Sequence, residues 1–169
     1  MRLSLILSGT LLCLLMGSCN PFAPSLDEDG LADVNLLGDP TNLNGYFQLF
    51  TNAYELRDTT LYGRLFTRDF TFAYYDPDLG QDVQWDRDTE VTIAYRLFQS
   101  VINVNLDWNY YTQLDSTELT ATVVRNFTLT IQQDENTSFS GTGRARMRLR
   151  RSSPADAWQA YYWFDDSDF

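Results

Sequence analysis

The segment at residues 144–150, "RARMRLR", most constrains the fold, because arginine and apolar residues alternate in it without a break. Successive side chains of a β-strand point to opposite faces, whereas a helix would scatter both sets around its circumference. Only a strand puts every arginine on one face and Ala145, Met147 and Leu149 on the other. The sequence therefore predicts a strand at 138–150 with an arginine face in solvent.

A second strand is predicted at 118–132, where threonine and apolar residues alternate with the same period. Antiparallel pairing would lay its threonine row beside the arginine row, leaving the opposite face to pack on helices. Strands at 104–112 and 157–165 complete a predicted four-strand meander. The apolar row of the second strand comprises Leu119, Ala121, Val123, Phe127, Leu129 and Ile131.

Upstream of the meander the apolar spacing changes to three or four residues, which is typical of helices. The sequence predicts a helix at 41–57, a short helix at 60–66 and a strand at 70–75. Asp86 is the predicted N-cap of a further helix, with Trp85 as a hydrophobic staple just outside it. The predicted apolar stripe of that helix comprises Val91, Tyr95, Phe98 and Ile102.

Two motifs and the order of elements resemble the nuclear-transport-factor-two-like superfamily. The motifs are "AYELRDTTLYGRLFTRDFTF" at 53–72 and "WQAYYWFDD" at 158–166, and the resemblance covers roughly 41–165. This superfamily, a cystatin-like α+β cone, includes steroid delta-isomerases, scytalone dehydratases and polyketide cyclases. The resemblance implies an α+β fold, with a curved antiparallel sheet wrapped around N-terminal helices and a cone-shaped cavity.

The candidate pocket consists of aromatic residues and one arginine that lies in an apolar row. Tyrosine and tryptophan offer apolar walls with a polar tip, although the same spacing is typical of core residues. A buried guanidinium needs a carboxylate or a bound anion. Arg125 is therefore an anchor for an acidic ligand, or is turned outward by a β-bulge, or pairs with an aspartate. The candidates are Tyr46, Tyr54, Tyr74, Trp108, Arg125 and Tyr162.

The chain contains no histidine, which excludes Ser-His-Asp and Cys-His catalytic systems and removes the commonest zinc ligand. The resemblance to steroid isomerases implies an aspartate base, and Asp76, Asp107 and Asp165 are the candidates. Alternation turns Asp107 outward, and Asp76 falls in a turn. Scytalone dehydratases and many cyclases of the family use histidine, so its absence disfavours those reactions. The sequence predicts no catalytic residue, metal or cofactor, and favours a protein that is not an enzyme.

The first nineteen residues, "MRLSLILSGTLLCLLMGSC", resemble a bacterial lipoprotein signal. The resemblance implies cleavage after residue 18 and acylation of Cys19; the alternative is an ordinary signal peptide with a chance cysteine. Residues 19–39 would form a tether and 40–169 the domain. Asn20 after the cysteine favours the outer membrane of a bacterial cell envelope, with the domain facing the periplasm or the cell surface.

Three functions stay open from the sequence alone. The first is a lipid-anchored accessory module that binds a small apolar or acidic ligand or a partner; the others are a steroid-isomerase-type isomerase or lyase and a purely structural envelope lipoprotein. The net charge of -11 disfavours nucleic acid as a partner. The arginine face is a solvated surface, an anion- or glycan-binding face, or a homodimer interface that contains Arg144, Arg146, Arg148, Tyr161 and Trp163.

Overall fold

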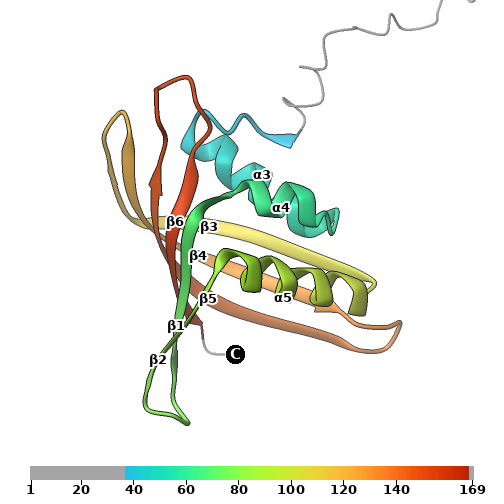
Figure 1. The fold of residues 1–169 in the computed structure, drawn as a ribbon. Helices are drawn as coiled ribbons and strands as arrows, with labels where there is room; N and C mark the ends of the chain where they lie inside the picture. The colour runs from blue at the N-terminus through green and yellow to red at the C-terminus, as the bar shows by residue number, and fades with distance from the viewer. Residues whose placement is uncertain (1–36, 168–169) are drawn as a thin grey trace, which may run out of the picture. The chain divides into compact units, whose positions relative to one another are not determined.

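The computed structural model describes residues 37–167, which form an α+β domain with three helices against one curved, open sheet (Figure 1). The six strands have the order β2-β1-β6-β5-β4-β3. This arrangement confirms the predicted fold class. The elements are α3 (Leu43–Glu55), α4 (Thr59–Arg64), β1 (Phe66–Asp76), β2 (Gln81–Asp86), α5 (Arg87–Ser100), β3 (Asn103–Ser116), β4 (Thr120–Gln132), β5 (Ser138–Arg150) and β6 (Gln159–Ser167).

The helices cover one face of the sheet, which we call the inner face, and leave the outer face uncovered. The predicted meander of β3 to β6 is present and antiparallel throughout. Beyond it, β1 pairs with β6 in parallel and β2 pairs with β1 antiparallel, so the sheet is antiparallel except at one junction. Helix α5 connects β2, at one edge of the sheet, with β3 at the other.

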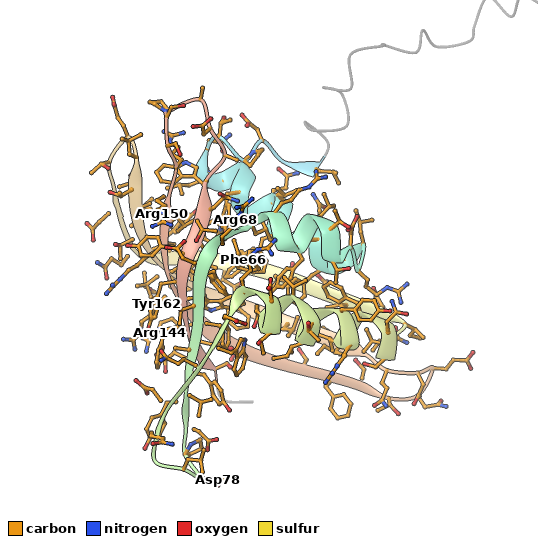
Figure 2. The ribbon with its side chains drawn as sticks, in the orientation of Figure 1. Phe66, Arg68, Asp78, Arg144, Arg150 and Tyr162 are labelled. Carbon is orange, nitrogen blue, oxygen red and sulfur yellow. The ribbon has the colours of Figure 1, made fainter. Side chains whose placement is uncertain are left out.

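The predicted alternation of apolar residues and arginines in β5 is confirmed. Ala145, Met147 and Leu149 are at most 1% exposed, and the intervening arginines lie on the outer face. Thr122 of β4 pairs with Arg148, as the predicted threonine and arginine rows require. Figure 2 shows Arg144, Tyr162 and Arg150 on the side of the sheet away from α5.

Helix α3 begins where the Asn42 side chain accepts a hydrogen bond from Gly45 N at 2.8 Å. It ends before Arg57, whose φ of 54° is left-handed and cannot continue the helix. Its buried face places Phe50 at the centre of the core, with ring centroids of six other aromatic residues 5.3–6.3 Å away. The six rings belong to Tyr46, Tyr54, Tyr62, Phe66, Trp108 and Trp163.

Helix α5 and strand β2 differ from the sequence-based prediction. Asp86 caps α5 as predicted, accepting from Thr89 N at 2.9 Å. The buried line of α5, however, is Glu90, Ala94 and Phe98, whereas two members of the predicted stripe, Tyr95 and Ile102, are 52% exposed. The residues just before the helix form β2, a strand that was not predicted from the sequence.

Within the described residues, none of the helices has the length and apolar character needed to cross a membrane. Cys19, the predicted signal peptide and most of the predicted tether lie outside the described residues.

Candidate functional site

A cavity of about 50 Å³ lies between α3 and the inner face of the sheet. Its wall includes Tyr54 of α3, Trp108 of β3, Phe127 of β4, and Trp163 and Asp165 of β6. Trp163 and Asp165 are two residues apart on one strand, so both point to the inner face. The cavity is therefore lined by aromatic rings and a single carboxyl group.

Three of the residues that line this cavity each have a buried polar side-chain atom without a hydrogen-bond partner. These atoms are the indole nitrogens (Nε1) of Trp108 and Trp163 and the Oδ1 atom of Asp165. Buried polar groups in proteins are nearly always hydrogen-bonded, so each exception needs an explanation. Two unpartnered donors and one unpartnered acceptor therefore belong to residues of the same cavity.

The environment of Asp165 favours its neutral form. Burial raises the pKa of this carboxyl from 3.8 to about 6. A hydrogen bond involving Ser167 opposes the shift, and the negative charges of Glu90 and Asp166 add to it. Because a pKa near 6 lies close to neutral pH, Asp165 is poised to exchange a proton or to bond either a donor or an acceptor.

A second carboxyl group, that of Glu90, is buried at 5% exposure in the first turn of α5. Tyr62 donates its hydroxyl to Glu90 Oε1 at 2.6 Å, and Trp85 donates Nε1 to Oε2 at 2.6 Å. Burial raises the pKa of Glu90, while these two hydrogen bonds oppose the rise. Glu90 is thus fully bonded, and it fixes the orientation of two aromatic side chains rather than offering a free group.

Sequence reasoning missed Glu90. An acid in the first turn of a helix is usually a solvated residue that interacts with the helix dipole. The available signal was the four-residue spacing from Glu90 to Ala94 and Phe98, which puts the acid on the buried line of the helix.

A larger hollow, of about 680 Å³, lies beside the cavity, and Asp165 lines both. Its apolar walls come from β1 and β2, where the rings of Phe72 and Trp85 stack at 4.6 Å and Tyr74 lies 5.5 Å from Trp85. A molecule in this hollow would therefore meet aromatic rings together with the carboxyl groups of Asp165 and Asp166.

The predicted pocket residues are not all brought together. Tyr54 and Trp108 line the cavity, and Tyr74 lines the neighbouring hollow. Tyr46 is fully buried in the core and donates its hydroxyl to the Leu65 carbonyl at 3.3 Å. Tyr162 lies on the outer face, where the Arg148 guanidinium stacks over its ring at 5.3 Å.

Tyr162 and Trp163 have exchanged the faces expected from alternation. Trp163 is 5% exposed on the inner face, away from the predicted interface. The cause is a register shift in which Arg148 pairs with Tyr162 but Leu149 pairs with Ala160. The shift leaves Tyr161 as an extra residue, and one extra residue reverses the parity of everything on one side of it.

Arg125 is half-buried and does not line the Asp165 cavity, although it contacts Trp108 of the cavity wall. Its guanidinium carbon lies over the rings of Phe47 and Tyr111, 4.7 and 4.4 Å from their centroids, and its Nε donates to the Asn109 carbonyl at 2.9 Å. The opposing strand β3 has register shifts at this point, so the irregularity is in the partner strand. Arg125 lines a further hollow of about 350 Å³ beside α3. No carboxylate among the described residues forms an ion pair with Arg125.

Of the three aspartates considered as bases, two lie away from the cavity. Asp107 is exposed, and Asp76 accepts hydrogen bonds from Asp78 N and Leu79 N in the β1–β2 turn. Only Asp165 lines the inner cavity. Within residues 37–167, no group of three or more potential metal ligands is found.

The outer face carries cations stacked on rings. Arg146 lies over Phe164 at 5.6 Å and Arg150 over Tyr161 at 5.1 Å. Arg144 and Arg146 both bind the Asp166 carboxylate. The predicted homodimer interface on this face stays a prediction.

No protein-family model and no curated protein matches the sequence. Solved structures do match. A scytalone dehydratase-like protein from Novosphingobium aromaticivorans has a TM-score of 0.64 and 13% identity, covering 82% of this chain and 89% of the other. An NTF2-like superfamily protein from Salmonella enterica has a TM-score of 0.60 and 11% identity, covering 81% and 92%. The described domain has the NTF2-like fold.

An NTF2-like protein of unknown function in nutrient uptake from Rhodospirillum rubrum gives a third match, with a TM-score of 0.59, 17% identity and coverage of 76% and 99%. The predicted superfamily resemblance is thus confirmed at the level of the fold. NTF2-like neighbours include enzymes and proteins of unknown function, so the site and not the fold must supply the function.

Proposed function

We propose that this NTF2-like domain binds a small apolar molecule that carries one hydroxyl group, with the hydroxyl held beside Asp165. The observation that carries the proposal is that three residues lining one cavity each have a buried polar atom without a hydrogen-bond partner. A hydroxyl has one donor and two acceptor positions. It matches two indole N–H donors, on Trp108 and Trp163, and one carboxyl acceptor.

The volumes support a ligand whose polar end alone enters the cavity. About 50 Å³ is enough for one water-sized group and too small for a whole ligand. The adjoining hollow of about 680 Å³ falls within the usual range for ligand sites. We therefore place the apolar body of the ligand between Phe72, Tyr74 and Trp85, with its hydroxyl directed at Asp165.

Charge favours an apolar ligand over the acidic one that the sequence also allowed. The negative charges of Glu90 and Asp166 lie near Asp165, and their repulsion contributes to its raised pKa. A ligand carboxylate would add a further negative charge at a poorly solvated place, which is costly.

Calorimetric titration of the full chain with 2-naphthol and with naphthalene tests the proposal. We expect naphthol to bind at least ten times more tightly, since each hydrogen bond contributes about 1 kcal/mol. Trp163→Phe keeps a ring but removes a donor, and should weaken naphthol binding about fivefold while leaving naphthalene unchanged. Trp158→Phe, at a buried tryptophan away from the cavity, is the matched control.

Equal affinity for the two compounds, or no binding of either, would contradict the proposal. The second result would favour a purely structural domain in which a trapped water satisfies the three polar atoms.

A second function, proton transfer of the isomerase or lyase kind, is favoured by one observation: the pKa of Asp165 is raised to about 6. A general base is most effective when its pKa lies near the working pH. The test is deuterium exchange in D₂O at the carbon beside the carbonyl of 2-tetralone. Exchange by the wild type that is lost in Asp165→Asn would support it, and no exchange above buffer would remove it.

We propose, in addition, that Cys19 is acylated and anchors the protein in a bacterial cell envelope. The support is the sequence pattern before Cys19. Labelled palmitate should enter the wild type and Cys13→Ser but not Cys19→Ser. Label retained in Cys19→Ser would overturn the anchor without affecting the ligand proposal.

A further inference from the structure

A second hollow, of about 840 Å³, opens where α4 passes into β1 and the chain turns from β5 to β6. Figure 2 labels Phe66, Arg68 and Arg150 close together there. The residues that line it do not include any that line the Asp165 cavity. What it could bind is therefore independent of the proposed function.

Positive charge is concentrated in this hollow. Five arginines and two aspartates line it, although the whole chain has twelve arginines, no lysine and a net charge of -11. Such a local excess of cations in an acidic protein attracts anions to this hollow. The five are Arg64, Arg68, Arg87, Arg150 and Arg151.

Two of these arginines are held rigidly. The Arg151 guanidinium donates to the carbonyls of Glu118, Thr41 and Pro154 at 2.6–2.7 Å and stacks over Trp158 at 4.4 Å. Arg87 donates from Nη2 to the Gly63 carbonyl at 2.7 Å. A Cβ at Gly63 would lie 3.1 Å from that Nη2 atom, so glycine leaves room for the guanidinium.

Some residues that line the hollow have hydrogen-bond donors without a partner. Arg87 Nε is buried without a hydrogen-bond partner, and so is the hydroxyl of Thr67, a residue only 9% exposed. The Thr67 hydroxyl lowers the pKa of nearby Asp69 but makes no hydrogen bond of normal geometry. Arg64 and Arg68 are exposed, and neither forms a side-chain hydrogen bond or ion pair with any described residue.

All five buried, unpartnered side-chain polar atoms of residues 37–167 thus belong to residues that line either the Asp165 cavity or this arginine-lined hollow, three at the cavity and two at the hollow. The two here are a guanidinium N–H and a hydroxyl, both of which can donate to an oxyanion.

We propose that this arginine hollow binds a compact molecule that carries two or more phosphate groups. A guanidinium presents a planar fork of donors that fits phosphate oxygens, and several forks with a net positive charge match a diphosphate better than a single anion. We expect a compact ligand, because a chain with a net charge of -11 repels a long polyanion.

The test is calorimetric titration of the full chain with pyrophosphate, orthophosphate and citrate in magnesium-free buffer at low salt. Pyrophosphate should bind at least ten times more tightly than orthophosphate or citrate. The double variant Arg64→Ala/Arg68→Ala should weaken pyrophosphate binding at least tenfold. Its melting temperature should equal that of the wild type, because neither side chain has a partner in the fold.

Arg96→Ala is the control, since Arg96 is exposed on α5 and does not line the hollow. It should leave pyrophosphate affinity unchanged. No pyrophosphate binding, equal binding by the double variant, or equal loss in Arg96→Ala would each overturn the proposal. Citrate binding as tightly as pyrophosphate would overturn the phosphate class. None of these results affects the naphthol experiment.

Discussion

Both faces of the sheet bring charged groups against aromatic rings, but the two faces differ in how far those charged groups are exposed to water. On the outer face, arginines of β5 lie over rings of β6, and both partners remain in contact with water. On the inner face, two carboxyl groups are enclosed by rings and have raised pKa values. The charged groups of the outer face are therefore solvated surface groups, whereas the enclosed carboxyl groups of the inner face belong to the candidate site.

The largest expected effect contrasts one ring on each side of the sheet. Phe50→Ala should lower the free energy of unfolding by about 3–5 kcal/mol, because it removes the fully buried ring at the centre of the core. Tyr162→Ala on the outer face should cost less than about 1 kcal/mol. Urea unfolding measures both, and similar losses would show that the two faces are not energetically distinct.

A smaller loss is expected for Tyr62→Phe. It removes the hydroxyl that bonds Glu90 Oε1, and a hydrogen bond to a buried charged group contributes about 1.5–3 kcal/mol. The loss should be greatest at a pH where Glu90 is ionised. Tyr95→Phe, at an exposed tyrosine on α5, should change nothing measurable. A loss below about 0.5 kcal/mol for Tyr62→Phe would contradict the claim that the Tyr62–Glu90 hydrogen bond stabilises the fold.

Asp165→Asn should stabilise the protein above pH 6 and not below pH 4. Because the folded state raises the pKa of Asp165 from 3.8 to about 6, stability falls as pH rises through that window. At pH 8 we expect the variant to be more stable by about 1–3 kcal/mol. Asp107→Asn, at an exposed aspartate of β3, is the control. A stability difference independent of pH would contradict the assignment.

The smallest effect is expected for Asp166→Asn. This change removes the carboxylate shared by Arg144 and Arg146 on the partly exposed outer face. Such ion pairs contribute about 0–1 kcal/mol and weaken with salt. Thermal unfolding at low and high salt should show a small difference that vanishes at high salt. A loss above 2 kcal/mol at high salt would mean that this face is structurally as important as the core.

Much of the fold was predictable because local patterns determined it. The uninterrupted alternation in β5, the helical spacing of α3 and the cap at Asp86 each need only neighbouring residues. Strand β2 was missed because it is short and mostly polar, and only its pairing with β1 makes it a strand.

The candidate site was less predictable, because it depends on tertiary contacts. The single-residue shift in β6 moved Trp163 to the inner face and Tyr162 to the outer one, and nothing in "WQAYYWFDD" announces it. Glu90 was hidden by its position in a first helical turn. Asp165 was among the candidate bases, but its burial could be established only once α3 and β3 were placed against β6.

The central claim is that Asp165 lies in a poorly solvated cavity that receives a polar group. The most direct test is a ¹³C NMR titration of the Asp165 carboxyl in the full chain, with and without 2-naphthol. We expect a midpoint near pH 6 without ligand and a changed midpoint with it. A midpoint near 3.8 that naphthol leaves unchanged would contradict the claim.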